Sequence, residues 1–382
     1  MPASPLLLLV PYRYKAAVLY SQIPISASAS GDFVVSRAGD TASRILGNGN
    51  IETGVLANIA RINYPRTGVA SGCAGLLVEP SGTNTCLQSE AWNVSPWVAT
   101  SGSQGATVSG NVTASPDGTT NADKLIEAAV TGNHFCLQGL TLTSGTTYTA
   151  SFFVKASERT RGVLRTSSGL GIYWDMEFNL TSGTVTGGTN PFIQNFGNGW
   201  YRIGATFTAN QASNNFILYL IDASGTASYT GDGTSGLFVF GAQVEVGSVA
   251  TSYIPTTTAA VTRNSDVITN NQFVIPNLIG AILTEFESPT SGTYFVDNLP
   301  VTLVSGYNKV AISYTPTTIT VYRNGTQVSG SPFSPPGGVL PILGNVINIG
   351  HNNQYYQLGA NIRSFVLYSS TLTAAEASGL TS

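Results

Sequence analysis

Residues 237–268 read LFVFGAQVEVGSVATSYIPTTTAAVTRNSDVI. The run 237–246 alternates apolar side chains with small or polar ones, which is typical of a half-buried β-strand. Gly247 ends this pattern, and a Ser/Thr-rich segment that contains Pro255 follows it. This stretch therefore predicts the last strand of one β-sandwich and a connector into a second domain.

The composition favours β-structure with many turns. Charged residues make up 9% of the 382 residues, against ~25% in typical domains. Ser, Thr, Asn and Gly must therefore provide most of the hydrophilic surface. Glycine occurs 42 times, which is more often than the ~7% of average proteins. A net charge of −3 provides no basic surface, so we expect neither nucleic-acid binding nor membrane insertion.

Three cysteines, Cys73, Cys86 and Cys136, are too few for a disulfide scaffold. None has a second cysteine or a histidine at zinc-finger spacing, so we expect no zinc site and no cofactor. We expect buried free thiols in a protein made in a reducing cytoplasm. A Cys73–Cys86 bridge is the alternative.

The first residues, MPASPLLLLVPYRYK, do not fit a secretory signal. The apolar run spans only 6–10, no positive charge precedes it, and Pro5 and Pro11 enclose it. The run predicts an extended strand that adds to the sheet edge of another subunit. An internal strand of the first domain is the alternative.

Residues 1–88 are expected to form a small β-rich unit. Asn48-Gly49 predicts a hairpin turn, and 76–78 predict a buried strand. The unit also holds many of the few charged residues of the chain. We expect its arginines to bind backbone carbonyls in loops, with subunit or particle contacts as the alternative. They are Arg37, Arg44, Arg61 and Arg66.

Residues 89–257 predict an antiparallel sandwich or jelly roll, because strand-like runs recur between Gly/Ser/Thr/Asn clusters. Only NADKLIEAA, residues 121–129, has helical potential. The expected strands are 148–154, 171–178, 200–207, 216–221 and 237–246.

Residues 258–382 predict a second sandwich. Asn324-Gly325 indicates a type I′ turn within a hairpin. Near the end, Thr373 and Glu376 form a capping box for a short helix, which we expect Gly379 to end.

Several of these segments resemble known families. The order RAGDTASRI, NGNIETGV, NIARINY and GLLVEPSGTN resembles the N-terminal region of phage fibre-like proteins. SPDGTTNADKL, GNGWYRI and FGAQVEVG resemble carbohydrate-binding-module-type jelly rolls of phage structural proteins. In the last unit, KVAISYTPTTITVYRNGTQV, INIGHNNQ and ANIRSFVLYSSTLTAAEASGLT resemble the closing half of a laminin-G or concanavalin-A-like sandwich, several of whose opening strands are lacking. It is therefore expected to be shortened, or to borrow strands from a neighbour.

The connector after Gly247 resembles a linker that recurs in virion surface proteins of tailed bacteriophages. This resemblance implies a fibre, spike or capsid decoration in the virion, attached to other virion proteins through residues 1–88. A homo-oligomer, commonly a trimer, and adhesion to a host-surface glycan are also implied. The alternatives are a secreted or cell-surface carbohydrate-binding protein and a polysaccharide-degrading tailspike.

A sugar site needs an aromatic face together with polar groups for the hydroxyls. We expect Trp174 in a strand, and Tyr355, Tyr356 and His351 in a polar loop, to be the candidates. The other three tryptophans, Trp92, Trp97 and Trp200, are expected to pack in the core.

The sequence also contains candidate residues for a calcium site and for a glycosidase site. Asp222, Asp232 and Glu245 are weak candidates for a calcium site, although their spacing does not match an EF-hand. Glu285 and Glu287 would share one face of a strand at a spacing compatible with glycosidase carboxylates. No nucleophile elbow, zinc-protease helix or phosphate-binding loop occurs, so we expect no enzyme.

Overall fold

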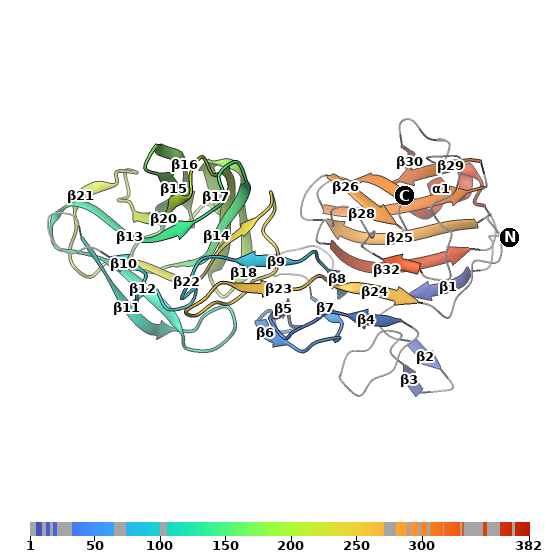
Figure 1. Ribbon diagram of the computed structural model, residues 1–382, viewed down its shortest axis with the longest axis horizontal. Coiled ribbons are helices and arrows are strands. Elements are labelled where there is room, and N and C mark those ends of the chain that lie inside the picture. Colours follow the sequence, from blue (N-terminus) through green and yellow to red (C-terminus); the bar gives the residue numbers. More distant parts are fainter. Residues whose placement is uncertain are drawn as a thin grey trace.

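Figure 1 shows the computed structural model of the chain as two β-rich lobes connected by extended strands. Apart from one short helix, the regular structure of the described residues consists of β-strands, which confirms the predicted all-β fold. The structure describes residues 5–9, 13–15, 18–20, 33–64, 74–99, 105–270, 280–288, 292–296, 299–303, 306–315, 317–328, 331, 347–349, 360–368 and 371–382.

The first lobe is a sandwich of two antiparallel sheets. One sheet has the order β10 (Val98–Ala99), β13 (Thr131–Thr141), β20 (Ser213–Leu220), β15 (Arg161–Ser168), β16 (Gly171–Asn179), β17 (Thr184–Gly187), with β21 (Ser228–Thr230) beside β13. The other has the order β11 (Ala106–Thr113), β12 (Ala122–Glu127), β22 (Gly236–Val246), β14 (Thr147–Ala156), β19 (Trp200–Thr208), β18 (Thr189–Gly197). All five strands expected from the sequence are present.

The core of this lobe lies between the two sheets and is rich in aromatic side chains. Trp92 and Trp97 stack with their ring centroids 4.1 Å apart, and Phe216 meets both rings edge-on. Trp200 is 2% exposed and packs in a separate buried cluster with Phe153, Phe240 and Tyr253. The expected packing role of these three tryptophans is therefore confirmed.

The short helix expected at 121–129 is wrong, because β12 occupies this segment. Its residues alternate between fully and partly buried positions, a period of two that a helix cannot provide. The strand pairs with β11 on one side and β22 on the other. Pairing on both edges outweighs the high helix propensity of Ala, Lys, Leu and Glu.

The second lobe contains two further antiparallel sheets. The larger has the order β30 (Thr326–Gln327), β29 (Ile319–Arg323), β28 (Gly306–Tyr314), β25 (Gly280–Ser288), β32 (Ala360–Tyr368), β8 (Gly75–Val78), β7 (Arg61–Asn63), with β1 (Pro5–Leu9) also on β32. The smaller has the order β27 (Leu299–Leu303), β26 (Gly292–Val296), β31 (Ile347–Ile349), β24 (Val267–Asn270), β4 (Val34–Ser36).

The N-terminal region of the same chain completes this lobe. Strands β1, β7 and β8 extend its larger sheet, and β4 extends its smaller one. The expected buried strand at 76–78 is confirmed as part of β8, whose residues are all buried. The second sandwich was expected to be shortened or to borrow strands from a neighbour, and strands from the beginning of the same chain complete it.

Three two-stranded ribbons lie outside the large sheets. One of them, β9–β23, runs between the lobes in Figure 1, and another, β5–β6, confirms the hairpin expected around Asn48-Gly49. The pairs are β2 (Arg13–Lys15) with β3 (Val18–Tyr20), β5 (Ala42–Ile45) with β6 (Ile51–Val55), and β9 (Gly82–Asn84) with β23 (Val261–Arg263).

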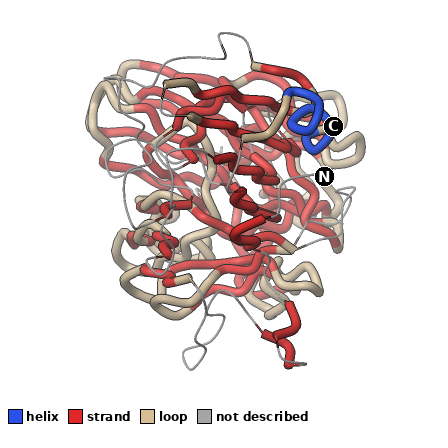
Figure 2. The backbone as a smooth tube through the Cα atoms, turned by 90° about the vertical axis from the view of Figure 1, so that its right-hand side faces the viewer, coloured by secondary structure: helices blue, strands red, loops and turns tan. Residues whose placement is uncertain are grey.

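Helix α1 (Ala374–Thr381) lies at the periphery of the molecule, seen in blue in Figure 2. Thr373 and Glu376 make both hydrogen bonds of the predicted capping box. The expected end at Gly379 is wrong, because the helix continues to Thr381, whose hydroxyl donates to the Ala377 carbonyl at 2.8 Å. The Asn324-Gly325 turn is confirmed, since both residues have positive φ, 47° and 81°.

Cys86 and Cys136 are buried free thiols, as expected, so Cys86 forms no bridge. Burial raises the pKa of both thiols, that of Cys136 to about 12, which leaves them protonated and unreactive at neutral pH. Cys73 lies outside the described residues. No helix among the described parts of the chain is long and apolar enough to cross a membrane.

Candidate functional site

One surface of the first lobe combines aromatic, cationic and anionic side chains. Cys136, Leu218 and Leu164 lie opposite one another on β13, β20 and β15 and are fully buried in the core. Because successive strand residues point to opposite faces, their neighbours point outward. We call this outer surface the sheet face; it consists of Phe135, Leu137, Arg161, Val163, Arg165, Asp175, Glu177, Ile217 and Tyr219.

Two aromatic rings form the apolar part of the sheet face. Phe135 lies directly opposite Tyr219 on the neighbouring strand, with the ring centroids 5.1 Å apart. The guanidinium of Arg165 lies 4.8 Å from the Tyr219 ring centroid, and its Nη1 donates to the Tyr219 hydroxyl at 3.3 Å. All three side chains are partly exposed, and the guanidinium covers one face of the Tyr219 ring.

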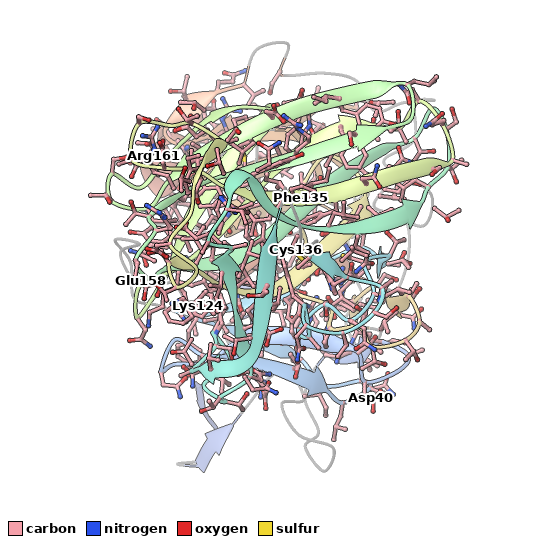
Figure 3. All side chains as sticks on the ribbon, turned by 90° about the vertical axis from the view of Figure 1, so that its left-hand side faces the viewer. Asp40, Lys124, Phe135, Cys136, Glu158 and Arg161 are labelled. Atoms are coloured by element: carbon pink, nitrogen blue, oxygen red, sulfur yellow. The ribbon has the colours of Figure 1, made fainter. Side chains whose placement is uncertain are left out.

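Ion pairs hold the polar groups of the sheet face in fixed orientations. Arg165 binds both carboxylate oxygens of Asp175, at 2.6 and 2.8 Å, and these hydrogen bonds raise the pKa of Arg165. Arg161 contacts Glu177 and donates to the Ala223 carbonyl at 2.6 Å. Phe135 and Arg161 are labelled in Figure 3, where the first lobe faces the viewer. Such groups can bind sugar hydroxyls without first losing much conformational freedom.

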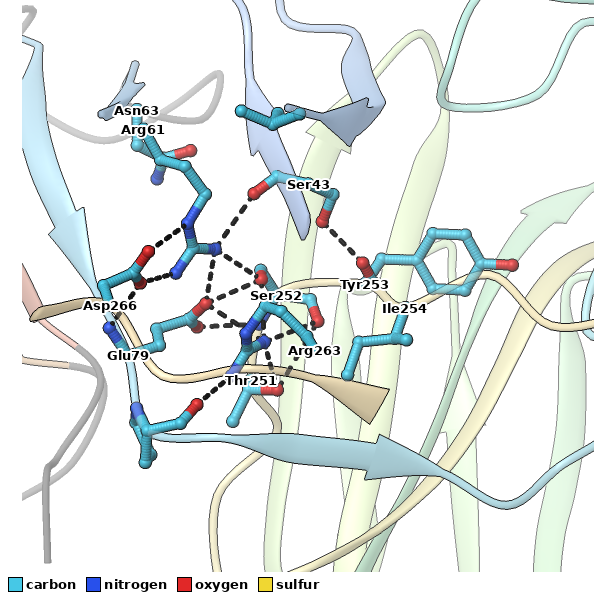
Figure 4. A network of polar contacts seen from close by, with 12 residues as sticks. Ser43, Arg61, Asn63, Glu79, Thr251, Ser252, Tyr253, Ile254, Arg263 and Asp266 are labelled. Carbon is cyan, nitrogen blue, oxygen red and sulfur yellow. Dashed lines mark hydrogen bonds and ion pairs between the residues drawn. The ribbon is translucent and has the colours of Figure 1, made fainter. Parts of the chain in front are cut away.

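A second cluster of charges lies between the lobes (Figure 4). Arg61 pairs with Asp266 and, at 2.7 Å, with Glu79. Glu79 also lies 3.2 Å from Arg263 and accepts two hydrogen bonds from Ser252. Burial disfavours the charged form of Glu79, but Arg263 and Arg61 outweigh it and lower its pKa to about 2.

These charges are closed to solvent, since the side chains of Arg61 and Arg263 have no exposed area. We call them, together with Arg37, the junction network. They come from the segments that precede and follow the first lobe in the sequence, and Ser252 belongs to the connector that follows β22. The junction network therefore holds the lobes together and offers no open site for a ligand.

The expected loop role of the arginines is confirmed where the structure describes them. Arg37 donates to the carbonyls of Val55, Leu56 and Ile59. Arg44 donates to the Ala60 carbonyl at 3.4 Å and pairs with Glu52, and Arg61 donates to the Ser43 carbonyl at 3.0 Å. Arg66 lies outside the described residues.

Trp174 lies on β16 with its ring partly buried. Its indole N–H donates to the Thr206 carbonyl, and its ring meets Phe207 edge-on at 6.5 Å. It packs against the core of the first lobe. The other three expected sugar-binding residues, His351, Tyr355 and Tyr356, lie outside the described residues.

The three weak calcium candidates each fulfil a local structural role. Asp222 accepts hydrogen bonds within its own turn from Ser224 and Thr226, and Asp232 does the same for residues 234–235. Glu245 is fully buried and accepts from Thr251. In the described part of the chain, no group of three or more His, Cys, Asp or Glu residues could hold a metal ion.

Glu285 and Glu287, the expected enzymatic rival, both lie on β25. Glu285 accepts a hydrogen bond from the Tyr307 hydroxyl at 2.7 Å. The side chain of Glu287 lies outside the described part of the structure.

The sequence alone did not single out the sheet face. Its residues are dispersed from position 135 to position 219 and become neighbours only through strand pairing. The alternation in RGVLR, residues 161–165, was a usable signal, because it places both arginines on one face of a strand. No protein-family model matches this chain, and a search of curated proteins gives no match.

Proposed function

We propose that this protein is a structural component of a tailed-bacteriophage virion that adheres to host-surface glycans through the sheet face. In this proposal it is a tail or head fibre, a spike or a capsid decoration. The sequence of residues 248–268 resembles phage linkers, and this resemblance supports membership of the virion. The arrangement of Tyr219, Arg165 and Asp175 carries the adhesive part of the proposal.

The chemistry of the sheet face favours binding over catalysis. A glycosidase needs one carboxyl group that can hold a proton for the leaving group and one free carboxylate. On the sheet face both carboxylates are already engaged, Asp175 by Arg165 and Glu177 by Arg161. A stacked aromatic ring beside such fixed polar groups fits a neutral or weakly charged sugar.

The adhesive role is tested by glycan-array binding with the Tyr219→Ala variant. Stacking of this kind contributes about 0.5–1.5 kcal/mol beyond area burial, so we expect binding to weaken roughly 2- to 10-fold. Tyr307→Ala is the matched control, because Tyr307 is an exposed tyrosine of the second lobe, and it should leave binding unchanged. Equal binding by the wild type and Tyr219→Ala would remove the sheet face as the site.

Membership of the particle needs a separate measurement. We expect mass spectrometry of purified virions to detect the chain, and recombinant protein to inhibit phage adsorption. A protein that binds glycans but is absent from particles would instead be a secreted or cell-surface lectin. Sugar release from capsular polysaccharide would indicate a tailspike enzyme.

A further inference from the structure

One edge of β32 is covered by two separate strands end to end. Residues Ala360 to Ile362 pair with β8, and residues Phe365 to Tyr368 pair with β1. The opposite edge of β32 is paired with β25. Phe365 and Val366 are buried at the position where β1 pairs. Without β1, this half of the edge would present unpaired backbone groups next to the core.

The two covering strands are held very differently. Strand β8 has β7 on its far side, and all its residues are buried. Strand β1 pairs with β32 and with no other strand among the described residues. Residues 10–33 separate β1 from β4 in sequence, and the strands within them, β2 and β3, pair only with each other.

The β2–β3 hairpin projects from the second lobe, at the bottom of both Figure 1 and Figure 2. A two-stranded hairpin is marginally stable in water unless further strands or a packing surface support it. In the described part of the chain no larger sheet takes it up. The hairpin therefore lies where a neighbouring molecule could support it.

We propose that β1 and the β2–β3 hairpin form an arm exchanged between copies of this chain, with β1 of one copy on the β32 edge of a second copy. The acceptor is the segment Phe365–Tyr368, and the register is the one seen within the chain, Leu8 opposite Val366. The occupant of this edge is thus a second copy of the chain, and glycan binding is not required.

Exchange keeps the strand pairing that the single chain already makes, so little enthalpy is lost. The cost of closing a connection rises only slowly with its length, by about 0.6 kcal/mol per doubling. A long connection such as 10–33 therefore favours the closed form only weakly. In the exchanged form the projecting hairpin would lie near the second copy, and any contacts it makes there would favour exchange.

The test uses two copies that each carry one introduced cysteine in a Cys73→Ser background; the two native cysteines that remain, Cys86 and Cys136, are buried. One copy carries Leu8→Cys, and the other carries Val366→Cys with a tag that changes its mass. Directly opposed residues of antiparallel strands lie ~4.5–5.5 Å apart, which suits a disulfide. The copies are unfolded, mixed, refolded and oxidised. We expect a mixed disulfide on a non-reducing gel.

The double variant Leu8→Cys with Val366→Cys should likewise give covalent dimers or larger species. The control pair is Val78→Cys with Ala360→Cys, which joins β8 to the same edge of β32. Because β8 is anchored on both sides, this pair should give a cross-linked monomer only.

A cross-linked monomer from the Leu8/Val366 pair, with no mixed species, would overturn the proposal. So would the absence of any cross-link in variants whose circular dichroism matches the wild type. Light scattering of the wild type gives a second readout, because the exchange should make it an oligomer. A single subunit in solution would also contradict strand exchange.

Discussion

At the scale of single residues, Glu79 shows what holds the lobes together. It is 4% exposed and faces two guanidinium groups, Arg61 and Arg263, at 2.7 and 3.2 Å. Buried ion pairs contribute little compared with apolar replacements, but loss of one partner leaves the others uncompensated. The junction network therefore makes the fold sensitive to any change that removes one negative charge.

Glu79→Gln should destabilise the protein by roughly 3–5 kcal/mol, as expected when one partner of a buried charge network is removed. Urea unfolding of both proteins measures the difference. The matched control is Glu177→Gln, which removes a partly exposed ion pair with Arg161 and should cost at most about 1 kcal/mol. Equal effects of the two substitutions would contradict the role assigned to the junction network.

The pKa of Glu79 also predicts the acid sensitivity of the fold. It lies at about 2 in the folded protein, below the ordinary 4.5, so the folded state favours the ionised form. The stabilisation is fully present above pH ~4.5 and is lost as the pH falls through about 2. The difference in unfolding free energy between the wild type and Glu79→Gln should shrink over this range, as measured by unfolding at stepwise lower pH.

At the scale of elements, close backbone approach decides which strand positions accept side chains. Gly204 on β19 lies opposite Ser151 of β14, and a Cβ there would lie 2.3 Å from the Ala150 carbonyl oxygen. Gly139 on β13 has no atom within 4 Å of such a Cβ. The same residue type is therefore essential in one strand and replaceable in another.

Gly204→Ala should destabilise the first lobe by about 1–3 kcal/mol, because the strands must separate to admit the methyl group. Gly139→Ala should be neutral or slightly stabilising, since it only restricts the unfolded chain. Thermal unfolding of the two variants compares them directly. A neutral Gly204→Ala would mean that β14 and β19 are packed less closely than the structure has them.

At the scale of the whole molecule, N-terminal and C-terminal strands pair with each other in the second lobe. The second lobe takes strands from both ends of the sequence, and the first lobe is inserted between them (Figure 1). The junction network stabilises this arrangement, because Arg61, which precedes the first lobe in the sequence, forms an ion pair with Asp266, which follows it. The lobes are therefore expected to depend on each other for folding.

Residues 258–382 expressed alone should not fold, although the sequence predicts them as a unit. This fragment lacks β7 and β8 of its larger sheet and β4 of its smaller one. We expect aggregation or a disordered far-UV circular dichroism spectrum. Residues 33–382, which keep these strands, should give a native-like β spectrum. A folded, monomeric 258–382 fragment would show that the N-terminal strands are dispensable.

The β-class, five strands of the first lobe, the Asn324-Gly325 turn and the capping box of α1 follow from the amino-acid sequence alone. These features depend on local side-chain patterns and on residues that tolerate particular backbone angles. Only the tertiary structure decided that β12 is a strand, that residues 61–63 and 75–78 complete the second lobe, and that Tyr219 and Arg165 meet on one face. Each of these features depends on strand pairing between segments that are distant in the sequence. Local sequence does not predict such pairing, because the stabilising contacts of a strand are made with its partner strand.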